Sequence, residues 1–99
     1  MPKCLVVSRI GERLQQARTM GACTARELDR IADTTEGHVS LLESGVVENV
    51  TVDTMARWAL ALGVTLDWLV LGAGRAPSER TVRAAVEAAR ATYAANNAA

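Results

Sequence analysis

Residues that start and end helices alternate along most of this chain. Hydroxyl residues that can cap a helix N-terminus recur along the chain, and apolar residues at helical spacing follow each of them. Glycine ends most of these segments, as expected for a helix C-terminus. The expected starts are Ser8, Thr24, Thr35, Thr51, Thr65 and Ser78, and the expected ends include Gly21, Gly45, Gly63 and Gly72. The pattern predicts six helices and an all-α fold.

The length and composition predict one domain with additions at both ends. A chain of 99 residues can bury one modest core, and with two Trp, one Tyr and no Phe that core must consist mainly of aliphatic residues. Residues 10–72 are the expected domain. Residues 1–9 form a short N-terminal arm, in which "CLVV" (4–7) is β-prone and could be an arm or an edge strand. Residues 73–99 are a linker and a C-terminal helix.

Several classes of function are excluded by what the sequence lacks. No apolar run is long enough to span a membrane or to form a signal peptide, which predicts a cytoplasmic protein with no membrane partner. Cys4 and Cys23 lack the neighbouring Cys and His residues that a zinc site requires. We therefore expect two reduced thiols and no bound metal. No cofactor motif and no catalytic constellation is present, and we therefore predict that the chain is not an enzyme.

Charge is unevenly distributed, although the net charge is zero. Residues 1–30 contain six bases and three acids, whereas residues 31–56 contain five acids and no base. The second stretch includes "TTEGHVSLLESG" (34–45), which follows the helix predicted after "TARE" (24–27), a capping box. Two short helices with only Asp33 and Thr34 between them are typical of a helix-turn-helix, with the third helix over residues 35–43.

Three segments carry a resemblance to a known family. The segments "IGERLQQAR", "TARELDRIADTTEGHVSLLESG" and "TVDTMARWALALGVTLDWLVLG" resemble the Cro/repressor-type, or XRE-like, helix-turn-helix family over residues 10–72. The resemblance implies a five-helix lambda-repressor-like domain. Its second helix would lie over the DNA backbone and its third would enter the major groove, usually in a homodimer on a two-fold operator.

Transferring the family's contact positions to this chain gives the candidate DNA-binding residues. Arg26 and Arg30 are the best phosphate ligands, and Ala25 offers a backbone amide where the family commonly has Gln. A Glu side chain can accept a hydrogen bond from the amino group of cytosine, and a Ser hydroxyl can hydrogen-bond to several base edges. A Leu side chain can contact the methyl group of thymine. His38 is either a solvent-facing residue or a contact that strengthens when protonated. The full set is Ala25, Arg26, Arg30, Thr34, Thr35, Glu36, Gly37, His38, Ser40, Leu41, Asn49 and Thr51.

The resemblance also implies a structural ion pair between Arg18 and Glu43. Such a pair fixes the angle between the first and third helices. The loop after the third helix contains Val46, Val47, Glu48 and Val50, and it allows two interpretations. The valines could fold back on the core, or Val46, Val47 and Glu48 could form a surface for a protein partner.

We expect the C-terminal helix to pack on the domain or on a second copy of the chain, because an isolated helix of this length is seldom stable. A homodimer through helices five and six is the expected use. The expected interface residues are Trp68, Leu69, Leu71, Val82, Val86 and Tyr93.

The sequence therefore predicts a sequence-specific transcriptional regulator of the repressor type, with double-stranded DNA, in an inverted-repeat operator, as its partner. Two alternatives keep the same fold. One is a protein-interaction module with weak or no DNA binding, such as an anti-repressor or a regulator cofactor. The other is the antitoxin of a toxin-antitoxin pair.

Overall fold

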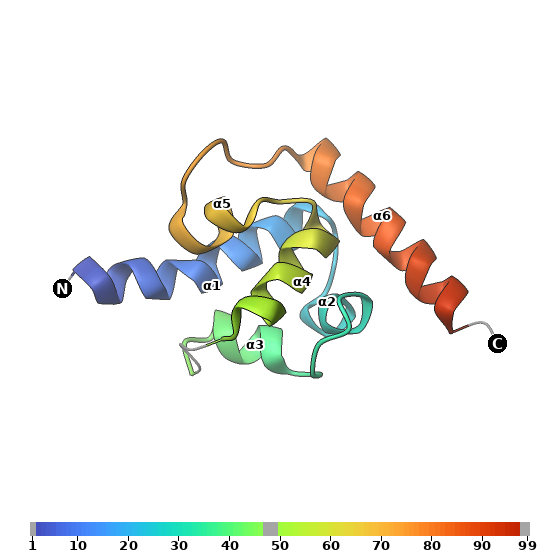
Figure 1. Cartoon of the computed structure of the whole chain (residues 1–99), viewed down its shortest axis with the longest axis horizontal. Helices are drawn as coiled ribbons and strands as arrows, with labels where there is room; N and C mark the ends of the chain where they lie inside the picture. The colour runs from blue at the N-terminus through green and yellow to red at the C-terminus, as the bar shows by residue number, and fades with distance from the viewer. Residues whose placement is uncertain (1, 47–49, 98–99) are drawn as a thin grey trace.

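The computed structural model describes the backbone of residues 2–46 and 50–97 and the side chains of residues 10–46 and 50–97. The described part of the chain forms six helices (Figure 1) and contains no strand, which confirms the all-α fold. No helix in the described ranges is long and apolar enough to cross a membrane. The helices are α1 (Pro2–Met20), α2 (Ala25–Ile31), α3 (His38–Glu43), α4 (Val52–Leu62), α5 (Leu66–Leu71) and α6 (Glu79–Asn96).

Four helices begin at the caps that the sequence predicted. In each, the hydroxyl oxygen of the capping residue accepts a hydrogen bond from a backbone N–H three residues later, which satisfies one donor of the exposed first turn. The capping residues are Thr24 for α2, Thr51 for α4, Thr65 for α5 and Ser78 for α6. Local chemistry therefore fixes where most of the elements start.

The start of α1 differs from the prediction. The segment "CLVV" is neither an extended arm nor an edge strand, because α1 runs without interruption from Pro2, and Ser8 lies inside the helix rather than at its cap. Proline is well tolerated in the first helical turn, and β-branched valines reduce helix propensity only slightly. The first turns of α1 project beyond the other helices (Figure 1).

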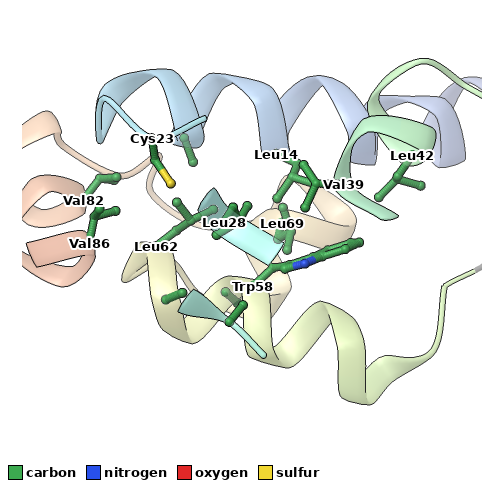
Figure 2. Close-up of a cluster of buried hydrophobic side chains, with 14 of the residues drawn as sticks. Leu14, Cys23, Leu28, Val39, Leu42, Trp58, Leu62, Leu69, Val82 and Val86 are labelled. Atoms are coloured by element: carbon green, nitrogen blue, oxygen red, sulfur yellow. The ribbon is translucent and has the colours of Figure 1, made fainter. Parts of the chain in front are cut away.

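The core lies between α1, α2, α4 and α5, with α3 and α6 closing it on two sides. Figure 2 shows Leu14, Leu28, Trp58, Leu62 and Leu69 in one cluster, and all five are fully or almost fully buried. Cys23 belongs to the same cluster, and burial raises the pKa of its thiol to about 12. The thiol is therefore protonated at neutral pH and packs as a small apolar group.

Helix α6 packs on its own domain. Val82 and Val86 have no exposed surface and contact the cluster near Cys23 and Leu62 (Figure 2). The close approach depends on glycine. A Cβ at Gly21 would lie 2.8 Å from Val86 Cγ2, and a Cβ at Gly63 would lie 2.6 Å from the Ala85 Cβ.

An ion pair joins α6 to the start of α2. The Arg90 guanidinium donates from Nε and Nη2 to the two carboxylate oxygens of Glu27, at 2.9 and 2.8 Å, and Nη2 also donates to the Ala22 carbonyl. The predicted capping box is therefore only half formed. Thr24 accepts from the Glu27 amide, but the Glu27 carboxylate binds Arg90.

We expect Arg90→Met to lower the free energy of unfolding by about 1 to 2 kcal/mol at neutral pH, since it removes charge-assisted hydrogen bonds that are only partly exposed. Arg90 lowers the pKa of Glu27 from its ordinary value of 4.5. The pair therefore contributes fully above pH 4.5, and its contribution falls as the pH drops through the lowered pKa of folded Glu27.

Urea unfolding at a series of pH values checks this expectation. The difference in stability between wild type and Arg90→Met should be largest near neutral pH and should shrink in acid. Arg83→Met is the matched control on the same helix, because it removes an exposed pair with Glu79 and a long hydrogen bond, at 3.4 Å, to the Met20 carbonyl, and neither contact involves Glu27. A difference that stays constant through the acid range would show that Glu27 is not the linked group.

Candidate nucleic-acid interface

The candidate phosphate ligands of α2 lie in different surroundings. Ala25 is half-buried against the core, so only its backbone amide is suited to phosphate. Arg26 pairs with Glu36 at 3.0 Å, and both side chains are more than two-thirds exposed. Arg30 is exposed and makes no ion pair with the residues that the structure describes. Because an exposed ion pair is weak, Arg26 can leave Glu36 to bind a DNA phosphate, and Arg30 can bind a phosphate directly.

The turn after α2 contains a left-handed residue. Asp33 has φ 60°, a conformation that Asp tolerates better than most residues. Its carboxylate accepts from Arg57 Nη1 at 3.3 Å, and Arg57 also pairs with Asp53. A cation of α4 thus offsets the acidic charge at the turn, and that cation lies outside the residues that the sequence singled out.

Helix α3 begins three residues later than predicted. The predicted helix covered residues 35–43, with Thr35 as its cap, but α3 spans His38–Glu43 and its first flanking residue is Gly37, with φ 93°. The Thr35 carbonyl instead accepts from the His38 amide in a turn. The left-handed Gly37 prevents the helix from starting earlier, and Thr35, Glu36 and Gly37 therefore lie in the turn.

The group that holds this turn was not found from the sequence. Asp29 of α2 is 1% exposed, and its carboxylate accepts from the amides of Gly37 at 3.0 Å and Val39 at 3.2 Å. It also accepts from the Thr34 hydroxyl at 2.7 Å. An Asp in the middle of an amphipathic helix is usually an outward polar residue, so no sequence signal distinguished it.

The outward side of α3 is small and only weakly polar. Ser40 is exposed, and Leu41 is 43% exposed. His38 is half-buried and contacts Trp58 edge to face, with ring centroids 5.5 Å apart. His38 is therefore not a simple solvent-facing residue, because one side of its ring packs against the aromatic core.

The loop after α3 is described only at its ends. Val50 packs on the core, as the first interpretation of the valines expects. Val46 is 72% exposed and keeps its surface for a protein partner, as the second interpretation expects. Thr51 is exposed and caps α4. The predictions for Val47, Glu48 and Asn49 lie outside the described residues.

Arg18 and Glu43 form a two-pronged pair. Arg18 Nε donates to Glu43 Oε2 and Nη2 donates to Oε1, both at 2.9 Å, and the side chains are 17% and 10% exposed. Arg18 Nη1 also donates to the Cys23 carbonyl. The hydrogen bonds to Glu43 raise the pKa of Arg18. This geometry fixes α3 against α1 and leaves little of either charge for DNA.

Most of the residues expected at a dimer interface are buried in the single chain. Trp68 is 5% exposed, and Leu69, Val82 and Val86 are fully buried, so in this conformation they have almost no surface for a second copy. Apolar spacing marked these faces correctly as buried, but their partner is the chain's own core. Leu71, at 64% exposed, and Tyr93, which is half-buried, keep surface for a partner.

A cleft of about 570 Å³ lies beside the turn, between α2 and the last turns of α6. Arg26, Arg30, Thr34 and Glu36 line one side of it. Thr92, Tyr93 and Asn96 of α6 and its C-cap residue Asn97 line the other side. Residues proposed from the sequence for phosphate and for base contact therefore lie side by side.

Comparison with known proteins agrees with this arrangement. A family model described as helix-turn-helix matches residues 14–69, which is more than half of the chain and spans α2, the turn and α3. No curated protein and no solved structure matched the chain. The chain belongs to the XRE-like helix-turn-helix family of DNA-binding regulators.

Proposed function

We propose that the chain is a cytoplasmic repressor-type regulator that binds an inverted-repeat operator as a homodimer. In this proposal α3 and the turn before it enter the major groove, and α2 lies over the DNA backbone. The observation that supports it best is the placement of Arg26 and Arg30 in the same cleft as Thr34 and Glu36. Phosphate ligands beside candidate base-reading groups are what sequence recognition requires.

The proposal assigns different roles to the residues of this face. Arg26, Arg30, the Ala25 amide and Thr51 position the backbone. Glu36, Ser40 and Leu41 contact base edges, which suits cytosine amino groups and thymine methyls rather than guanine. Thr34, Thr35, Gly37 and His38 supply the remaining surface of the turn, and Leu71 and Tyr93 supply part of the dimer contact.

A second function is favoured by the exposed apolar residues at the end of α3. Val46 is 72% exposed and Leu41 is 43% exposed, and the Val46 amide donates to the Leu41 carbonyl, so the two are neighbours. A protein partner would bury them, as in an anti-repressor, a regulator cofactor or an antitoxin bound to its toxin.

Selection from a pool of randomised duplexes separates these functions. A homodimeric repressor should enrich two inverted half-sites whose centres lie one or more helical turns apart, about 10 base pairs or a multiple of it. Enrichment of a single half-site would contradict the dimer. Failure to enrich any sequence would contradict sequence-specific binding and would favour the protein-interaction module.

A further inference from the structure

Asp29 is the one charged residue buried in the part of the chain that the structure describes. A buried carboxylate is costly unless hydrogen bonds compensate for the lost water. Here one carboxylate oxygen accepts from the Thr34 hydroxyl, and the other accepts from the amides of Gly37 and Val39. All three donors belong to the turn before α3 or to its first residues.

The same hydrogen bonds continue into α4. The Thr34 hydroxyl oxygen accepts from Trp58 Nε1 at 3.1 Å while its proton is donated to Asp29. The Trp58 ring in turn contacts His38. Asp29 and Trp58, from two different helices, thus hold residues 34–39 at several points. No described side-chain polar atom in this buried region is left without a partner.

From this geometry we infer that Asp29 is the positioning residue that sets the sequence preference of the DNA-reading segment. The inference rests on the proposed function. Asp29 itself has almost no surface and cannot touch DNA. It acts by holding Gly37 left-handed and by fixing where Glu36 and His38 lie relative to Arg26 and Arg30. Base discrimination needs a fixed side-chain position, whereas phosphate attraction does not.

Two substitutions of Asp29 should affect the position of the turn differently. Asp29→Ala leaves the amides of Gly37 and Val39 without their acceptor and frees the turn. Asp29→Asn keeps an oxygen for the two amides, and its NH₂ can donate to Thr34 Oγ1. Thr34 can then turn its own proton to the Asp29 backbone carbonyl, which already lies 3.4 Å away. The amide variant should therefore restore the position of the turn.

The experiment uses the duplex that the wild type enriches from a randomised pool and a scrambled duplex of equal length. Asp29→Ala should reduce the ratio of the two affinities by about tenfold or more, while the salt dependence on the scrambled duplex stays unchanged. Asp29→Asn should keep the ratio within about threefold of wild type. Val86→Ala is the stability control, since it opens the core at α6, far along the chain from the turn.

Each outcome decides the inference. It is supported if Asp29→Ala alone loses discrimination. It is overturned if Asp29→Ala keeps the ratio, or if Val86→Ala loses it equally, which would reduce Asp29 to a stability role. If Asp29→Ala does not fold, Asp29→Leu carries the same expectation, because it removes the same acceptor at a buried position and fills the space of the carboxylate. If the wild type enriches no sequence, both the proposed function and this inference are contradicted. If the wild type enriches a sequence and Asp29→Ala has the same ratio of affinities, only this inference is contradicted.

Discussion

Glu43→Leu should lower the free energy of unfolding by about 3 to 5 kcal/mol, because it leaves the Arg18 guanidinium largely buried without its carboxylate. Arg18 is only 17% exposed, and two of its nitrogens donate to Glu43. A domain of this size has a total stability of about 5 to 15 kcal/mol. The variant should therefore lose a large fraction of the total stability.

Urea unfolding of Glu43→Leu, Arg18→Met and the double variant measures the coupling. The double variant should be more stable than Glu43→Leu, since no charge is then stranded. Glu79→Gln is the control, because its pair with Arg83 is exposed and should be worth less than about 1 kcal/mol. Additive losses in the double variant would show that the two side chains do not stabilise the fold as a pair.

Gly63→Ala should be destabilising by about 2 to 5 kcal/mol through two separate effects. Gly63 has φ 69°, where a Cβ costs about 1 to 2 kcal/mol. The new Cβ would also lie 2.6 Å from the Ala85 Cβ of α6, and overpacking of this kind costs about 1 to 3 kcal/mol. The second effect exists only if α6 packs on α4 of the same chain.

Gly74→Ala isolates the backbone effect, because Gly74 has φ 84° and open space around it. Thermal or urea unfolding should show a clearly larger loss for Gly63→Ala than for Gly74→Ala. A shortened chain that ends before α6 should remove most of the difference. Equal losses at the two glycines would mean that α6 does not lie against Gly63 in solution.

Local chemistry explains which features could be predicted from the sequence. Caps such as Thr51 and ends such as Gly63 depend on neighbouring residues, and helical spacing identifies the buried faces of α4 and α5. The Arg18–Glu43 pair followed from the resemblance rather than from the residues alone. These features account for most of the fold and for the location of the candidate interface.

The features that were missed depend on contacts between residues distant in the sequence. Arg90 binds Glu27 across 63 positions, and Arg13 donates to the carbonyls of Leu69 and Val70 across more than 50. Spacing showed that Val82 is buried but not whether it packs on its own domain or on a second copy. The start of α3 was misplaced because the acceptor of its first amides, Asp29, comes from another helix.

Binding to a random-sequence duplex over a series of salt concentrations tests directly whether the face of α2 and α3 binds DNA. We expect the logarithm of the affinity to fall linearly with the logarithm of the salt concentration. The double variant Arg26→Ala/Arg30→Ala should reduce the magnitude of this slope by about 1 to 2. Arg75→Ala with Arg80→Ala is the control, since the linker and the start of α6 lie at the opposite end of the molecule from α3 (Figure 1). A slope that the first pair leaves unchanged, or that both pairs reduce equally, would contradict DNA binding by the face of α2 and α3.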